Sequence, residues 1–383
     1  MYLKLIFLNA LRHRLRSLLT LVGLVVAVIA FGLLQTVVGA WYAGAEGAST
    51  ARLVTRNAVS LIFPLPLTYK QKIRQVDGVR AIASANWFGA IYKEPKNFFP
   101  QFGVDDNYFG IYPEYVLADA EKTAWLKDKK GAIVGRKLAD DYGFKPGDAV
   151  TLKGTIFPGN WDFVIRAIYD GKEKKTDTSQ FFFHWDYLNE TLKKTVPRRA
   201  NAVGVYVLEL SDPGRAAEVS REVDARFANS QAETLTETEK AFQLGFVSMT
   251  EAIVVAIRLV SFLVIFIILA VMANTMAMTA RERMAEYATL KALGFGPDFV
   301  VKLIVGESLA IAAMGGTAGI LLTLPIAAGF SKAVGSLFPV FQVSPATMAM
   351  QAAAALAVGL IAALLPAWHA ARVNIVEGLR TAG

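Results

Sequence analysis

The sequence predicts a membrane α-helical protein with four transmembrane helices and an α+β extracytoplasmic domain inserted between the first two. The first observation is composition: of 383 residues, 54% are apolar and 19% are charged, whereas soluble domains average about 45–50% and about 25%. The second is distribution: residues 41–250 hold 28 Lys and Arg and 26 Asp and Glu, three quarters of all charged side chains. We therefore expect that segment to face water and the rest to lie mainly in hydrocarbon.

Four apolar stretches are long enough to cross a bilayer, which requires about 20 mostly apolar residues. They predict transmembrane helices at residues 17–40, 251–278, 301–328 and 345–368. The first stretch is followed by Ala43-Gly44-Ala45, which fits a signal-peptide cleavage site. However, its apolar run from Leu18 to Val38 exceeds the roughly 7–15 residues of a signal peptide. We interpret it as an uncleaved membrane anchor.

Basic residues predict which side of the membrane each segment faces, because short cytoplasmic loops are enriched in Lys and Arg. Outside residues 41–250 they concentrate in residues 1–16, 279–300 and 369–383, which we assign as a cytoplasmic N-terminal segment, a cytoplasmic helical segment and a cytoplasmic tail. Residues 41–250 and the loop 329–344 then lie outside. The net charge of +8 reports this topology. Nucleic-acid binding would need a clustered basic face, and we expect no nucleic-acid partner.

Residues 41–250 alternate strand-like and helix-like patterns, as expected for an α+β domain. Val79 to Tyr92 is typical of a strand, and Asp212-Pro213 supplies a cap and a first-turn proline for a helix. Thr236 to Met249 has a helical pattern, so we predict a continuous helical stalk into the second span, with a short flexible hinge as the alternative. The run Phe181-Phe182-Phe183 predicts either core packing or the lining of a path for an apolar substrate.

Signals for catalysis or metal binding are absent from the sequence. The chain has no cysteine, which excludes disulfides, thiolate zinc sites and thiol nucleophiles. Its three histidines, His13, His184 and His369, lack metal-ligand spacing. There is no phosphate-binding P-loop motif and no G-x-S-x-G nucleophile motif. We therefore predict no catalytic residue and no metal site.

Two features inside the predicted spans are candidates for function. Glu307 is a carboxylate within the third span, and an intramembrane carboxylate is a functional hypothesis by default. The alternative is that it reaches the membrane interface or bonds a neighbouring helix. Gly315, Gly316 and Gly319 have the small-residue spacing that permits close helix–helix approach in lipid. They predict either helix packing within the subunit or a dimer seam.

The segment between the second and third spans predicts a short amphipathic helix. Thr279-Ala280-Arg281-Glu282 has the T-x-x-E pattern of a capping box, so we expect the helix to run from Arg281 to Leu293. Gly294 can end it in a left-handed conformation. Such a helix, lying across the inner face, can bind a peripheral partner or can be a surface helix without one.

Four fragments, in order along the chain, resemble the permeases of the MacB, FtsX and LolC type, a family of ABC transporter subunits. Arg14 to Gly23 resembles the R-S-x-L-T-x-x-G entry to the first span, and Gly135 to Asp148 resembles a motif of the MacB-like periplasmic domain. Arg281 to Gly294 is similar to the family's cytoplasmic R-x-E-x-A-x-L-R-A-L-G element. Pro366 to Arg380 resembles the C-terminal tail, although Asn374-Ile375 replaces the usual Asp-Pro.

This resemblance implies a multi-pass permease of the cell inner membrane with its domain in the periplasm. A separate ATPase, which carries ATP and Mg, would dock on the helix of residues 279–300, termed the coupling helix. The permease itself would be non-catalytic and would bind no cofactor. The docking residues that the resemblance assigns are Arg281, Glu282, Glu286, Tyr287, Leu290, Lys291, Leu293 and Gly294.

The resemblance also implies partners and a function. The expected partners are an ABC ATPase, a second permease copy (as homodimer or paralogue heterodimer) and a periplasmic adaptor or carrier. The expected function is ATP-driven export, or extraction from the outer face, of an apolar or lipid-linked substrate. The alternatives are an FtsX-like mechanotransmitter that activates a periplasmic hydrolase, and a membrane sensor or scaffold that does not depend on ATP.

Overall fold

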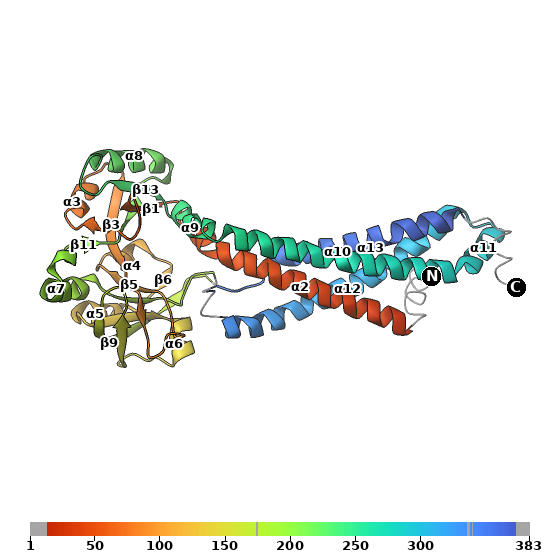
Figure 1. The fold of residues 1–383 in the computed structure, drawn as a ribbon, viewed down its shortest axis with the longest axis horizontal. Helices are drawn as coiled ribbons and strands as arrows, with labels where there is room; N and C mark the ends of the chain where they lie inside the picture. Colours follow the sequence, from red (N-terminus) through yellow and green to blue (C-terminus); the bar gives the residue numbers. More distant parts are fainter. Residues whose placement is uncertain (1–13, 174, 335–337, 339, 373–383) are drawn as a thin grey trace. The chain divides into compact units, whose positions relative to one another are not determined.

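The computed structural model describes residues 14–173, 175–334, 338 and 340–372, and forms two compact units (Figure 1). One unit is helical and combines the chain up to Trp41 with the segments that begin at Thr250 and at Phe341. The other comprises Tyr42–Met249 together with Gly335–Val340. Most of the expected cytoplasmic segments 1–16 and 369–383 lies outside the described residues.

Within the described residues, four helices are long and apolar enough to cross a membrane, which confirms the predicted fold class. They are α2 (Arg14–Gly47), α10 (Glu251–Glu282), α12 (Pro297–Val334) and α13 (Pro345–Ala371). Each extends a few residues past at least one end of the span expected from hydrophobicity. The reason is that hydrophobicity marks only the part of a helix in hydrocarbon, whereas backbone hydrogen bonding continues beyond it. A fifth helix, α11 (Met284–Ala292), follows α10.

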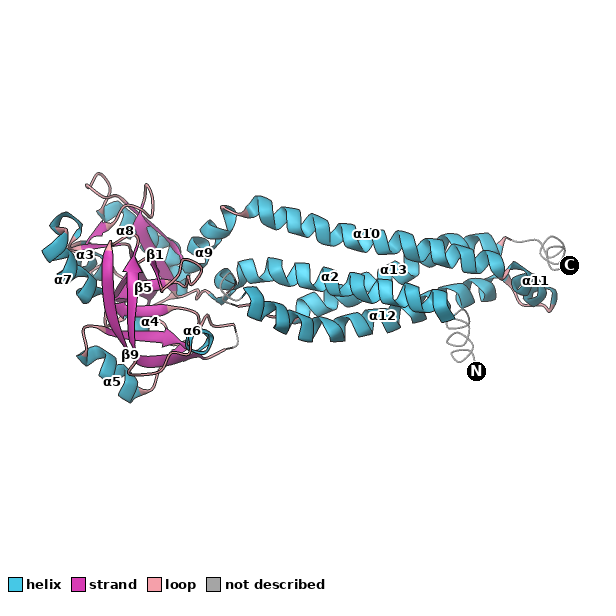
Figure 2. Ribbon diagram, turned by 60° about the horizontal axis from the view of Figure 1, so that its bottom comes forward, coloured by secondary structure: helices cyan, strands magenta, loops and turns pink. Residues whose placement is uncertain are grey.

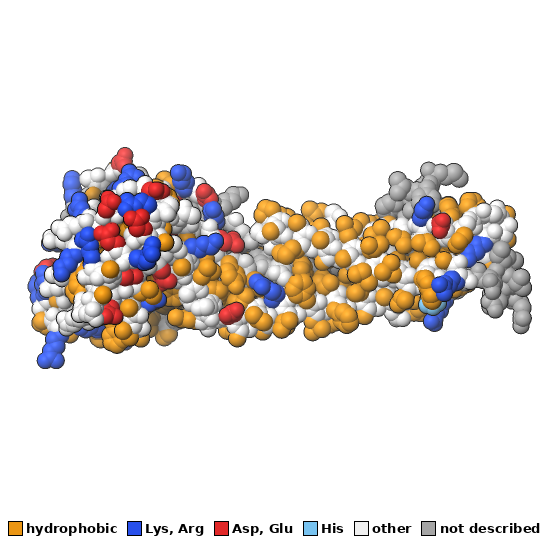
Figure 3. All heavy atoms as spheres, turned by 90° about the horizontal axis from the view of Figure 1, so that it is seen from above, with side chains coloured by type: hydrophobic (Ala, Val, Ile, Leu, Met, Phe, Trp, Pro, Cys, Tyr) orange, Lys and Arg blue, Asp and Glu red, His pale blue; other side chains and the backbone are white. Residues whose placement is uncertain are grey.

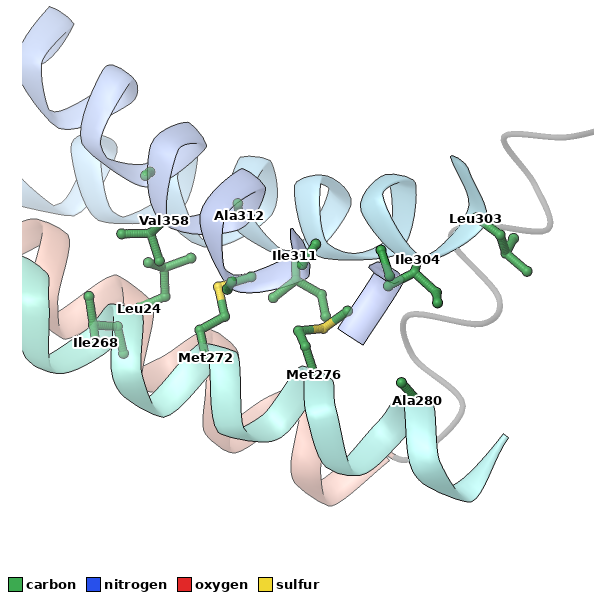
Figure 4. Packing of buried hydrophobic residues seen from close by; sticks show 14 of the residues in the cluster. Leu24, Ile268, Met272, Met276, Ala280, Leu303, Ile304, Ile311, Ala312 and Val358 are labelled. Atoms are coloured by element: carbon green, nitrogen blue, oxygen red, sulfur yellow. The ribbon is translucent and has the colours of Figure 1, made fainter. Parts of the chain in front are cut away.

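The helical unit is held together by an apolar core to which all four long helices contribute. Met272 and Met276 of α10 point toward Ile311 and Ala312 of α12 (Figure 4). Leu24 of α2 is fully buried in the same core. Hydrophobic side chains also dominate the outer surface of this unit in Figure 3, as expected for helices that face lipid.

The second unit is built on a mixed β-sheet. In the part of the chain that the structure describes, its strands follow the order β13-β1-β12-β3-β5-β10-β7-β9-β8-β4, and β6 pairs with β9. Two pairs of adjacent strands, β5 with β10 and β7 with β9, are parallel. The other adjacent pairs along this order are antiparallel. The strands are β1 (Arg52–Asn57), β3 (Val79–Trp87), β4 (Ala90–Ile91), β5 (Gln101–Val104), β6 (Tyr115–Val116), β7 (Gly131–Gly135), β8 (Ala149–Gly154), β9 (Gly159–Gly171), β10 (Phe181–His184), β12 (Val205–Leu210) and β13 (Thr234–Thr238).

Helices and a small second sheet complete this unit, and helices pack around the main sheet (Figure 2). The small sheet pairs β2 (Leu65–Pro66) with β11 (Ala202–Val203). The mixture of strands and helices agrees with the predicted α+β class. The helices are α3 (Tyr69–Arg74), α4 (Tyr108–Ile111), α5 (Asp119–Lys127), α6 (Arg136–Tyr142), α7 (Trp185–Thr195), α8 (Ala216–Arg226) and α9 (Glu239–Ser248).

The aromatic run of β10 lies in the core. Phe181, Phe182 and Phe183 are all fully buried. Successive strand side chains point to opposite faces, so Phe181 and Phe183 join one apolar cluster and Phe182 joins another. The run therefore packs both faces of the sheet and does not line an open path.

Two expected continuous elements are interrupted. The strand expected over Val79 to Tyr92 divides into β3 and β4, because Gly89 adopts a left-handed φ of 59°. The expected unbroken helical stalk is also wrong. α9 ends at Ser248 and α10 begins at Glu251, since Thr250 leaves the helical region with φ −115° and ψ 13°. Its hydroxyl accepts a hydrogen bond from the Trp41 indole N–H at 2.8 Å.

Candidate functional site

The junction between α10 and α11 is the candidate functional site. The expected capping box does not form there: Thr279 lies inside α10, and its hydroxyl donates to the Thr275 carbonyl oxygen at 3.0 Å. The apolar run before it continues as helix through Glu282, so no new N-terminus arises at Thr279. Arg283 instead adopts φ −102° and ψ 14°, which breaks the helix, and α11 begins at Met284.

Arg283 is buried at this break and binds two carboxylates. Its Nη1 lies 2.6 and 2.8 Å from the two carboxylate oxygens of Glu307, and its Nε lies 2.9 Å from Glu286 Oε2. Arg283 is 5% exposed and Glu307 is 3% exposed. Glu307 thus bonds a neighbouring segment, as in the alternative that the sequence left open to a functional intramembrane carboxylate. The pair fixes the start of α11 to α12.

The charge of Arg283 is maintained despite burial. Burial alone lowers its pKa, but the negative charge of Glu307 and hydrogen bonds to Glu307 and Glu286 outweigh this effect, so the pKa is raised. Tyr287 lies with its ring 5.3 Å from the guanidinium and is itself 1% exposed. Burial raises the pKa of Tyr287, so the phenol stays neutral beside the cation.

The far end of α11 is fixed to the fourth span. Lys291 Nζ donates to the carbonyl oxygens of Ala370 and Ala371 at 3.2 and 2.7 Å. These carbonyls belong to the last turn of α13, where helix carbonyls have no partner within the helix and attract cations. Ala288 is fully buried between these two attachments. α11 is therefore held to α12 at one end and to α13 at the other.

Gly294 ends α11 as expected, with a left-handed φ of 94°. Its N–H donates to the Lys291 carbonyl at 3.0 Å, and the Phe295 N–H donates to the Leu290 carbonyl at 3.1 Å. These two bonds form a Schellman motif. The motif turns the chain sharply into α12, which begins at Pro297.

The turn leaves an apolar tip exposed. Leu293 is 72% exposed and Phe295 is 44% exposed. We call these two residues the α11 tip. By contrast, Leu290 is half-buried and packs against the helical core. Of the remaining residues expected to dock an ATPase, Arg281 is exposed, and Glu282 forms a bidentate pair with Arg16 at 2.7 Å.

The three glycines of α12 lie at helix contacts within the chain. A Cβ on Gly319 would fall 2.7 Å from Val28 Cβ, and one on Gly315 would fall 2.7 Å from Leu24 Cδ2, both on α2. A Cβ on Gly316 would fall 2.8 Å from Ala355 Cβ on α13. Close packing of α12 against two helices therefore depends on the absence of these side chains.

Sequence reasoning missed three residues of this site: Arg283, Arg16 and Phe295. The two arginines served only as basic charges that set the topology and as members of the fragments that resemble the family, and Phe295 lay beyond the predicted end of the helix. One signal was available for Arg283, because a buried intramembrane acid requires a partner and Arg283 lies in the loop that precedes the span of Glu307. No group of three or more His, Cys, Asp or Glu side chains is placed to hold a metal among the described residues.

Two sequence families match this chain. Residues 17–226 match the MacB-like periplasmic core domain, and residues 258–375 match the C-terminal region of FtsX-like permeases. Together the two matches include most of each of the four long helices and most of the β-sheet domain.

Individual relatives agree with these matches. An uncharacterized ABC transporter permease of Methanocaldococcus jannaschii is 23% identical over 98% of this chain and 96% of its own length. The uncharacterized permease YvrN of Bacillus subtilis is 24% identical over 74% of this chain and 70% of its own length. The macrolide export ATP-binding/permease protein MacB of Sodalis glossinidius is 31% identical over 33% of this chain, but only 19% of its own length.

Among solved structures, the extracellular domain of YknZ, a noncanonic ABC-type transporter from Gram-positive bacteria, aligns with 49% of this chain and all of its own. The TM-score is 0.36 at 12% identity. A domain of a permease protein from Porphyromonas gingivalis aligns with 49% of this chain and 90% of its own, with a TM-score of 0.33 at 11% identity.

Proposed function

Because this chain belongs to the FtsX-like permeases with a MacB-like periplasmic core domain, a family of ABC transporter permeases, we propose that it transmits ATP-driven motion across the membrane. The family consists of permease subunits that are generally non-catalytic, and it implies an ATPase partner. In the proposal, that ATPase carries the ATP and Mg, and this chain contributes no catalytic residue and binds no cofactor. The motion drives export, or extraction from the outer face, of an apolar or lipid-linked substrate.

The observation that carries the proposal is the construction of α11. Its ends are attached to α12 through Arg283 and Glu307, and to α13 through Lys291. A partly exposed helix fixed to two spans transfers a push on its surface to both of them, because packed interiors have low compressibility. The α11 tip, Leu293 and Phe295, is the apolar surface that the ATPase would contact, since apolar side chains dominate the centres of protein interfaces.

The proposal also covers the oligomeric state, the location and the partners of the permease. The permease works as a dimer with a second copy or a paralogue, in the inner membrane, with its sheet domain in the periplasm. A periplasmic adaptor or carrier receives the substrate. The large domain of residues 42–249 favours export or extraction over simple activation of a hydrolase, because it offers extensive surface for a substrate or adaptor.

The test is co-purification of an ABC ATPase with the tagged full chain. We expect Leu293→Asp and Phe295→Asp to lower the recovered ATPase at least tenfold, since each places a charge in an apolar contact. Val196→Asp is the matched control, because Val196 is 41% exposed in the other unit, and it should leave recovery unchanged. Leu290→Asp is a poorer probe, because Leu290 also packs against the helical core.

The outcomes separate the candidate functions. Wild-type recovery with both tip variants would show that the docking surface lies elsewhere. Failure of the wild-type chain to recover any ATPase would support the sensor or scaffold. Stimulation of a periplasmic hydrolase by the ATPase complex, without movement of an apolar substrate, would support the mechanotransmitter.

A further inference from the structure

The segment that leads from α2 into the sheet domain and the segment that leads from the sheet domain toward α10 join strands at one edge of the sheet. β1 begins at Arg52, shortly after α2 ends, and β13 ends at Thr238, directly before α9. The two strands pair antiparallel, with Leu53 opposite Thr238. The incoming and outgoing segments of the chain are therefore neighbours within the domain.

Glu239 ties these two segments together. It is the first residue of α9, and its side chain is buried. Its Oε2 accepts hydrogen bonds from the backbone N–H of Ser49 at 2.9 Å and from Arg52 Nε at 2.7 Å. Ser49 precedes β1, so one carboxylate on α9 holds the chain that enters the domain.

Arg52 extends this contact to a third segment, the loop between α4 and β6. Its Nη1 lies 3.0 Å from Glu114 Oε2 and 3.2 Å from the Ile111 carbonyl oxygen, and its Nη2 lies 2.5 Å from Glu114 Oε1. Its guanidinium also lies over the Tyr112 ring, 4.2 Å from the centroid. The planar fork of arginine allows all these contacts from one side chain. We call Arg52, Glu114 and Glu239 the Arg52 cluster.

Aromatic contacts continue from the cluster toward the centre of the sheet. Tyr112 stacks on Tyr108 and Tyr115, with centroids 4.6 and 5.5 Å apart. Both of those rings contact Phe182 of β10, at 5.4 and 5.6 Å. The contacts from the first residue of α9 to the middle of the sheet are thus contiguous.

We propose that the Arg52 cluster is the joint through which movement of α9 reaches the β-sheet, an inference that rests on the proposed function. Separating buried charges leaves each of them without a partner at a high desolvation cost. A displacement of α9 therefore carries Arg52 and the loop of Glu114 with it. A contiguous set of contacts alone does not establish coupling, so the proposal requires a measurement of motion.

The experiment uses the absence of native cysteine. Spin labels at Lys240→Cys on α9 and Lys127→Cys on α5, both exposed positions, report the distance between α9 and the far half of the sheet. The full chain is reconstituted in nanodiscs with its co-purified ATPase, and distances are measured without nucleotide and with ATP and vanadate. We expect wild type to change the distance on trapping, and Glu239→Gln and Arg52→Gln to lose at least half of that change.

The controls distinguish a failure of the Arg52 cluster as the joint from a failure of the proposed function. Arg56→Gln breaks the Arg56–Glu237 ion pair between β1 and β13 and should show the same distance change as wild type. ATP hydrolysis should stay within twofold of wild type in all variants. Glu239→Gln keeps an oxygen for Ser49 and thus the fold, which near-UV circular dichroism checks. A full distance change in both Glu239→Gln and Arg52→Gln overturns the joint alone. No change in wild type overturns the proposed function and the joint with it.

Discussion

Arg283 and Glu307 form a buried ion pair in which one guanidinium nitrogen contacts both carboxylate oxygens, at 2.6 and 2.8 Å. The pair joins the break between α10 and α11 to α12. It converts Glu307, which in the sequence is an isolated charge in an apolar span, into the attachment point of α11.

Glu307→Ala should strongly destabilise the helical unit. The change removes the buried partner of Arg283 and leaves it only the partly exposed Glu286, and breaking a buried pair costs about 3–5 kcal/mol. Arg16→Ala is the control, because the Arg16–Glu282 pair is partly exposed and such pairs contribute about 0–1 kcal/mol. Unfolding of the purified full chain in detergent measures both changes. Equal losses would contradict the assigned role, whereas Arg283→Met combined with Glu307→Leu should recover much of the stability.

Gly294→Ala should lower stability by about 1–2 kcal/mol, because a Cβ disfavours the left-handed conformation that Gly294 adopts at φ 94°. Gly294→Asn should cost less, since asparagine tolerates this region. Gly296→Ala is the control, as its Cβ would meet nothing within 4 Å. The same unfolding assay ranks the three variants, and a neutral Gly294→Ala would argue against the Schellman turn.

Gly319→Ala should destabilise the packing of α12 on α2 by about 1–3 kcal/mol, as overpacking does in well-packed cores. The new Cβ would meet Val28 Cβ at 2.7 Å and the Val25 carbonyl oxygen at 3.2 Å, and neither can move without its helix. Gly329→Ala, on the same helix but in open space, should be neutral or slightly stabilising. Thermal unfolding of the two variants side by side checks the difference; the reverse order would refute the assigned contact.

Topology is testable by cysteine labelling, because the chain has no cysteine of its own. Ser211→Cys in the sheet domain should react with a membrane-impermeant maleimide in intact cells. Leu293→Cys at the α11 tip should react only after the cells are permeabilised. Both positions are exposed, so access to the reagent decides the result. Labelling of Leu293→Cys alone in intact cells would invert the proposed orientation.

Sequence patterns predicted the structure correctly where its physical cause lies in residues close together in the chain. The four spans follow from apolar runs, and the end of α11 follows from a glycine at the position where a left-handed residue is needed. The predictions from sequence patterns were wrong at Thr279 and after Met249. The T-x-x-E pattern at Thr279 is compatible with a helix interior as well as a helix start. The interruption after Met249 involves a hydrogen bond between Trp41 and Thr250, which are 209 residues apart.

The sequence by itself determined the membrane class, the number of spans and the domain between the first two, because hydrophobicity and charge act through composition along the chain. Only the tertiary structure decided which charges pair. Arg283 meets Glu307 across 24 residues, and Arg52 meets Glu239 across 187. With 40 basic and 32 acidic residues available, spacing cannot select these partners. Burial selects them, because a charge removed from water must meet its opposite where the fold brings the two together.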